Sequence, residues 1–78
     1  MVFLIQYDRN LGRIVTIDSF MDSERERAEE LRLELELQLN LKGVDDEVVL
    51  LEARSEKALR RTHRRYFEDL SELTSAPA

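Results

Sequence analysis

The sequence has no cysteine, one histidine, one proline and two glycines among its 78 residues. Without cysteine it can form no disulfide and no thiolate metal site, and the single histidine, His63, is too few for the usual structural zinc sites. No apolar run approaches the roughly 20 residues of a membrane span. The first residues lack the basic region and the long apolar run of a secretion signal. We therefore expect a cytoplasmic protein with no membrane segment and no cofactor.

The short length limits the core. A chain of this size buries only about 60% of the surface that it exposes when unfolded. Disulfides, metals and oligomerisation are the usual means of stabilising such a domain, and the composition removes the first two. We expect one domain over residues 1–73, a disordered tail over residues 74–78, and a need for a partner surface.

The charge is uneven along the chain. The net charge is −5, with a net of −7 over residues 21–53 and a net of +5 over residues 54–65. A basic block thus lies inside an acidic protein, and an acidic total does not favour nucleic acid as a partner.

Local signals predict three strands and two helices. Residues 2–8 and 13–18 are rich in strand formers and flank an Asn/Gly turn, which indicates a β-hairpin. Residues 47–53 have the apolar centre of a third strand. Ser23 and Glu26 have the spacing of a capping box before a first helix, and Ser55 can cap a second helix that runs to about residue 73.

The residues from 31 to 41 carry a leucine at every second position, which is the periodicity of a strand. Their composition favours a helix instead, and Gly43 suits the left-handed position that ends one. On a helix the leucines form two stripes. One stripe is Ala28, Leu31, Leu35 and Leu39, and the other is Leu33, Leu37 and Leu41. Such a helix has two surfaces to cover.

The element order ββαβα predicts an α+β fold. We expect a three-stranded antiparallel sheet of order 2-1-3, with both helices packed on one face. Residues 49–60, VLLEARSEKALR, resemble the strand-to-helix step of small ferredoxin-like α+β proteins. The order of that fold is βαββαβ, so we carry no function across from it.

The second helix carries a basic row at spacings of three and four. Its members are Lys57, Arg60, Arg61, Arg64 and Arg65. Such a row can follow the phosphates of a nucleic acid or another polyanion. No glycine-rich loop or interleaved aromatic residues accompany it, so we favour arginines that pair with the acidic segments or face solvent, and we keep polyanion binding as the alternative.

Other candidate residues give weaker signals. His63 could act as a general base, but no spacing selects an acid to orient it, and the flank of a buried stripe suits it better. Tyr7 and Tyr66 could line a small polar pocket, although tyrosines more often lie at the edge of a core. The carboxylates of residues 45–47 lack the spacing of a calcium loop. We expect no metal site, and we rank an enzyme built around His63, Tyr7 and Tyr66 as one polar site below self-association and below polyanion binding.

Self-association is the function that we predict from the apolar surface. With both helices on one face of the sheet, the other face stays open, and the first helix keeps a surplus leucine stripe. A two-fold homodimer is the commonest way to cover such a patch, and another protein is a possible partner. The candidate interface residues are Val15, Ile17, Leu33, Leu37 and Leu41.

Overall fold

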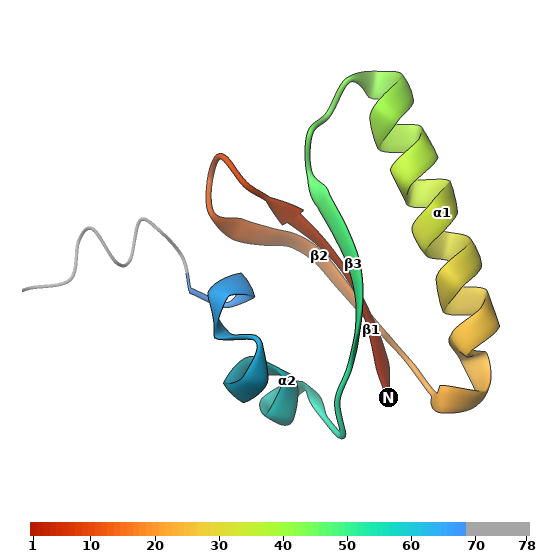
Figure 1. Cartoon of the computed structure of the whole chain (residues 1–78), viewed down its shortest axis with the longest axis vertical. Coiled ribbons are helices and arrows are strands. Elements are labelled where there is room, and N and C mark those ends of the chain that lie inside the picture. The colour runs from red at the N-terminus through yellow and green to blue at the C-terminus, as the bar shows by residue number, and fades with distance from the viewer. Residues whose placement is uncertain (69–78) are drawn as a thin grey trace, which may run out of the picture.

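A computed structural model describes residues 1–68 of the chain. Within that range the elements follow the order β1, β2, η1, α1, β3, α2, η2 (Figure 1). Their bounds are Val2–Asp8 (β1), Arg13–Phe20 (β2), Asp22–Glu24 (η1), Arg25–Lys42 (α1), Glu47–Glu52 (β3), Glu56–Thr62 (α2) and Arg64–Tyr66 (η2), where η marks a 3-10 helix. The predicted tail over residues 74–78 and the predicted helical residues 69–73 lie outside the described range.

β1 is the central strand. It pairs antiparallel with β2 on one side and with β3 on the other, so the sheet order is β2-β1-β3. The first four residues of β1 are at most 5% exposed, as expected for a strand covered on both faces. The predicted α+β class, the antiparallel pairing and the order 2-1-3 are confirmed.

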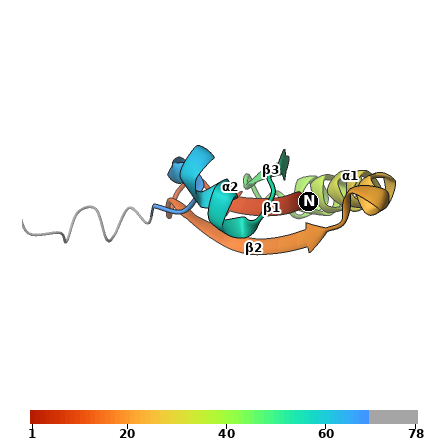
Figure 2. The same cartoon turned by 90° about the horizontal axis from the view of Figure 1, so that it is seen from below.

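The two helices lie on opposite faces of the sheet. Figure 1 shows the three strands overlapping in the edge-on view of the sheet, with α1 to their right and α2 to their left, and Figure 2 shows the two helices toward the same two sides from below. The molecule is 12 Å deep along its shortest axis, which agrees with three strands about 4.8 Å apart stacked along that axis. The predicted placement of both helices on one face is therefore wrong.

The apolar character of β1 explains this arrangement. Successive side chains of a strand point to opposite faces, and both sets are buried here. They are Val2 and Leu4 on the face of α1, and Phe3, Ile5 and Tyr7 on the face of α2. α1 covers only the first set. Leu59 of α2 and Tyr66 of η2 pack on the second set, so each helix removes a separate apolar surface from water.

A β-bulge changes which side chains of β2 lie on the same face of the sheet. Ile5 pairs with Ile17 and Tyr7 pairs with Ile14, so the three residues 5–7 of β1 lie opposite the four residues 14–17 of β2. Val15 is the extra residue of the bulge. Ile14 and Ile17 therefore share the α2 face, where both pack against the core. Strict alternation predicts these two side chains on opposite faces, and the bulge is the reason that this prediction fails.

α1 is helical throughout its leucine-rich segment, as the composition predicts. It ends at Gly43, whose φ of 71° is the left-handed conformation. The Val44 amide donates to the Leu39 carbonyl over 2.9 Å, which closes the last turn. The C-terminal signal in the sequence is therefore confirmed.

The start of α1 differs from the prediction. A 3-10 turn precedes the helix, and the Met21 amide donates to the Glu24 carboxylate over 2.9 Å. The predicted capping box of Ser23 and Glu26 is therefore wrong, because the capping pair is Met21 and Glu24, two residues earlier in the chain.

α2 is shorter than predicted. Ser55 caps it as expected, with its hydroxyl accepting the Ala58 amide over 3.2 Å. The helix ends at Thr62, whose hydroxyl donates back to the carbonyls of Ala58 and Leu59, and His63 leaves the helical conformation at φ −124° and ψ 52°. A continuous helix over residues 63–68 was predicted and is wrong. The break turns the chain so that Tyr66 reaches the sheet.

Candidate functional site

The basic row of the second helix divides into two groups. Four of its five side chains line one surface hollow of about 540 Å³, which we call the cationic hollow: Lys57, Arg60, Arg61 and Arg64. Arg60 and Arg64 each pair with a glutamate of the same segment, at 3.4 and 3.6 Å. Lys57 and Arg61 form no ion pair with any residue of the range 1–68. The cationic hollow therefore keeps two cations available for a ligand.

Arg65, the fifth member of the row, makes its contacts with other residues of the chain at the surface. Its guanidinium lies 2.8 Å from the Glu47 carboxylate and 4.1 Å from the centre of the Tyr66 ring. The Tyr66 hydroxyl donates to the same carboxylate over 2.5 Å. Tyr7 meets Tyr66 edge-to-face, with ring centres 5.2 Å apart. We call these four residues the Glu47 clamp. It fixes η2 to the start of β3 and the end of β1.

The clamp perturbs the acid–base properties of its members. The hydrogen bond from Tyr66, and then the guanidinium groups of Arg65 and Arg9, hold the pKa of Glu47 below its ordinary value of 4.5 against the opposing effect of partial burial. Burial, followed by the contact with Glu47, raises the pKa of the Tyr66 hydroxyl above its ordinary value of 10.0. A tyrosine that holds its proton more tightly remains a hydrogen-bond donor, which agrees with the bond from the Tyr66 hydroxyl to Glu47.

The clamp makes stability depend on pH on the acid side. The pKa of Glu47 is lower in the folded chain than in the unfolded chain. Its contribution to the free energy of unfolding is therefore complete above the unfolded pKa and is lost as the pH falls through the folded pKa. We expect the free energy of unfolding to drop below about pH 4.5, and to drop less steeply in Glu47→Gln. Urea denaturation at several pH values measures the free energy of unfolding of the unmodified chain and of Glu47→Gln. If this free energy falls equally steeply with decreasing pH in both proteins, Glu47 is not the group responsible.

His63 stands apart from the two tyrosines with which it was grouped. It caps the end of α2, and its Nδ1 lies 2.9 Å from the Thr62 hydroxyl. Within residues 1–68 no carboxylate forms a hydrogen bond with its ring. Tyr7 and Tyr66 meet each other in the clamp instead. The structure therefore does not bring these three residues together as one polar site.

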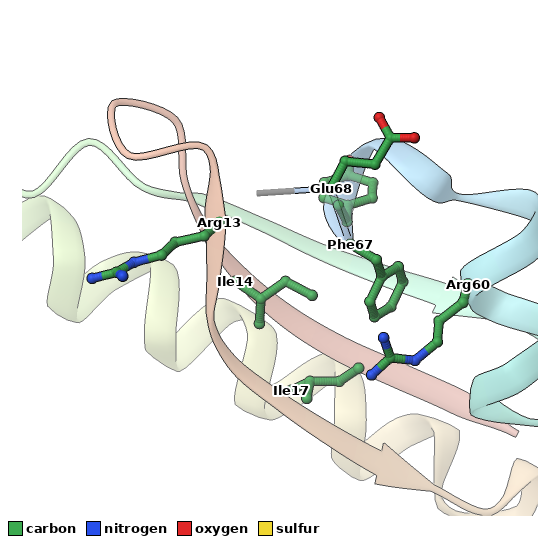
Figure 3. A pocket seen from close by; sticks show the side chains of 7 residues that line it. Arg13, Ile14, Ile17, Arg60, Phe67 and Glu68 are labelled. Atoms are coloured by element: carbon green, nitrogen blue, oxygen red, sulfur yellow. The ribbon is translucent and has the colours of Figure 1, made fainter. Parts of the chain in front are cut away.

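A small cleft of about 290 Å³ separates β2 from the end of α2 and η2 (Figure 3). Its residues are Arg13, Ile14, Ile17, Arg60, Tyr66, Phe67 and Glu68. Figure 3 shows Ile14 and Ile17 pointing from β2 toward Phe67, and the Arg60 guanidinium lies 4.6 Å from the centre of the Phe67 ring. Ligand pockets usually measure about 300–1,000 Å³. The cleft therefore lies at the lower limit for a ligand, and we assign none to it.

The candidate interface residues fall into two groups. Leu33, Leu37 and Leu41 are 57%, 59% and 79% exposed on the face of α1 that points away from the sheet. This is the surplus stripe that the leucine pattern predicts. Val15, at the bulge, is 50% exposed, whereas Ile17 packs against the core. These last two residues do not form one surface.

The acidic residues before β3 are engaged in local contacts. The Asp45 carboxylate lies 3.3 Å from the Arg9 guanidinium, and the Asp46 carboxylate accepts a hydrogen bond from the side-chain amide of Gln6 over 2.7 Å. Over residues 1–68, no group of three or more acidic or histidine side chains is placed to hold a metal ion.

Sequence reasoning missed the Glu47 clamp and the cleft. One feature of the sequence could have indicated the clamp, because the predicted strand order 2-1-3 places Tyr7 beside Glu47 across the sheet. No feature of the sequence could have indicated the cleft, since the cleft depends on the bulge at Val15 and on the break at His63.

No helix in the described part of the chain is long and apolar enough to cross a membrane. Comparison with protein-family models, with curated proteins and with solved structures finds no match to this chain.

Proposed function

We propose that this protein acts by self-association through the leucine stripe on the outer face of α1. Leu33, Leu37 and Leu41 recur at intervals of four along the helix, and each is more than half exposed. A row of this kind on the side of a helix that faces away from its own sheet is the usual mark of a helix–helix interface. This exposure is the observation that carries the proposal.

A second copy of the chain fits the stripe by symmetry. A two-fold axis near Leu37 places Leu33 of one copy against Leu41 of the other, so both ends of the stripe are covered at once. The two helices would run antiparallel, which opposes their dipoles favourably. Association also adds stability to a domain whose own core is small.

The open sheet face, the other predicted interface, is less well supported. Each face of the sheet is covered by one helix, and Ile17 is already part of the core. Only Val15 remains as an exposed apolar residue on the middle of β2.

We also propose that the protein works in the cytoplasm and needs no cofactor, which the absence of cysteine supports.

Two matched substitutions separate the two interfaces. Leu37→Glu puts a charge at the centre of the stripe, and burying an unpaired charge in an apolar interface costs several kcal/mol, so we expect a monomer. Val15→Glu puts the same charge on the exposed bulge and should leave the dimer intact. Light scattering at micromolar concentration measures both masses. A monomer from Val15→Glu together with a dimer from Leu37→Glu would contradict the proposal.

A second candidate function is the binding of a polyanion in the cationic hollow. The observation that favours it is that four cationic side chains line one shallow hollow of the surface. Arg65 is not part of this site, because it is held in the Glu47 clamp. Lys57 and Arg61, which no carboxylate of residues 1–68 neutralises, would make the strongest contacts.

This second candidate predicts a steep dependence on salt. If the hollow binds duplex DNA, the logarithm of the affinity falls linearly with the logarithm of the salt concentration, by roughly 0.9 per phosphate contacted. Exchanging both free cations, Lys57→Glu with Arg61→Glu, should abolish the binding, whereas Arg27→Glu on α1 should not. Fluorescence anisotropy with a labelled duplex measures this. Absence of binding at about 50 mM salt would rule the candidate out.

A further inference from the structure

The cleft between β2 and η2 has apolar walls that residues 1–68 cover only in part. Ile14 and Ile17 point from β2 toward Phe67 across the cleft (Figure 3), and all three side chains are partly buried against the core. α2 has only seven residues, and its one buried side chain, Leu59, packs on the centre of the sheet. The α2 face is therefore closed over β1 and remains open over β2.

The charged residues of the cleft are mainly cationic. They are Arg13, Arg60 and Glu68, and Glu68 lies 3.6 Å from Arg64, which is outside the cleft. Within residues 1–68, Arg13 forms no ion pair, and Arg60 has only Glu56 of its own helix, at 3.4 Å. The cleft therefore suits an apolar group that carries negative charge beside it.

The chain leaves the described range at the edge of this cleft. Glu68, the last described residue, lines it, and ten residues follow. Their sequence is DLSELTSAPA, which has two leucines, two carboxylates and no basic side chain. An extended chain spans at most about 3.6 Å per residue, so Leu70 lies within about 7 Å of Glu68 and Leu73 within about 18 Å. Both leucines can therefore reach the cleft.

We propose that residues 69–73 lie across the cleft and pack their two leucines against its apolar walls. Asp69 and Glu72 would then lie beside Arg13 and Arg60. The segment removes the open apolar surface over β2 from water, and it closes the cleft to other ligands. No residue of the leucine stripe takes part, so the proposal does not depend on self-association.

The covalent link selects this segment over a second copy or a free ligand. A group on a short flexible linker has a millimolar effective concentration, which a separate molecule has to exceed in order to compete. Charge also favours it, because residues 69–73 carry −2 whereas residues 54–65 carry +5. The arginines of the cleft attract the first segment and repel the second.

The test is an NMR measurement on the full chain with labelled isoleucine methyl groups. The chain has only three isoleucines, and Ile5, which is 0% exposed in the core, serves as the internal reference for Ile14 and Ile17. We expect nuclear Overhauser effects between the methyl groups of Leu70 and those of Ile14 or Ile17, unchanged on dilution. Their absence would overturn the proposal. Effects found only between differently labelled copies in a mixed sample would assign the cleft to a second copy and would also overturn it.

Substitutions in the segment give a second readout. We expect Leu70→Ser to move the methyl signals of Ile14 and Ile17 and to leave that of Ile5 in place. Leu70→Met keeps an apolar side chain and should preserve the original positions. Ala76→Ser, beyond both leucines, is the matched control. If Leu70→Ser moves the two signals no further than this control does, the segment does not occupy the cleft.

A charge exchange tests the role of the arginines. Glu72→Lys should move the Ile14 and Ile17 signals part of the way toward their positions in Leu70→Ser at low salt, and they should return as salt screens the repulsion. Ser75→Lys adds the same side chain outside the segment and should have no such effect. Identical signals for the two variants at every salt concentration would contradict the electrostatic part of the proposal.

Discussion

Replacing Leu59 by alanine is expected to remove most of the stability of the folded chain. Leu59 is 0% exposed and is the one buried side chain of α2. It packs on the face of β1 that carries Phe3, Ile5 and Tyr7. Truncating a buried leucine costs about 2–5 kcal/mol, and a domain of this size is expected to have only about 3–5 kcal/mol in total.

Urea denaturation measures this loss. Met21→Ala is the matched control, since Met21 is also a large apolar residue but is 67% exposed, and its midpoint should barely move. If Leu59→Ala shifts the midpoint no further than this control does, α2 does not contribute to the core in the way described.

A proline in the middle of α1 should unfold the domain. Leu35 lies in the interior of an 18-residue helix, on the stripe that faces the sheet. Proline there removes a backbone hydrogen bond and clashes with the preceding turn, at a cost of about 3 kcal/mol or more. We expect Leu35→Pro to lose its helical circular dichroism and its cooperative unfolding transition.

The control for this substitution is Glu26→Pro. Glu26 lies in the first turn of α1, where the amide has no partner in the helix and proline is tolerated. Its spectrum should match that of the unmodified chain. A native spectrum for Leu35→Pro would mean that α1 is not required for the fold.

The features that could be predicted from the sequence are local ones. Ser55 and Gly43 mark helix ends through their own backbone and side-chain chemistry, and both act as predicted. The helix over the alternating leucines was also predictable, because helix propensity acts within a few residues. The exposure of Leu37 followed directly from that assignment.

The placement of the helices was not predictable in the same way. Both faces of β1 are apolar, so the residue pattern alone does not say which face each helix covers. Once α1 covers Val2 and Leu4, the remaining apolar face is left for α2, and this depends on tertiary packing. The error mattered, because the open sheet face was one of the two interfaces proposed for a dimer.

The Glu47 clamp and the bulge are also products of tertiary structure. Glu47 and Tyr66 are 19 residues apart, and the hydrogen bond between them forms only because α2 breaks at His63. Arg65 belongs by spacing to the basic row, yet this break turns it toward Glu47 and away from the cationic hollow. Sequence periodicity treats the segment as one continuous helix and therefore cannot separate Arg65 from Arg64.

The mass of the full chain in solution tests the central claim most directly. Sedimentation equilibrium at micromolar concentration requires no substitution and no label. Self-association through α1 predicts a mass twice that of the 9.2 kDa chain, with dissociation on dilution. A mass of 9.2 kDa at every concentration would contradict the account.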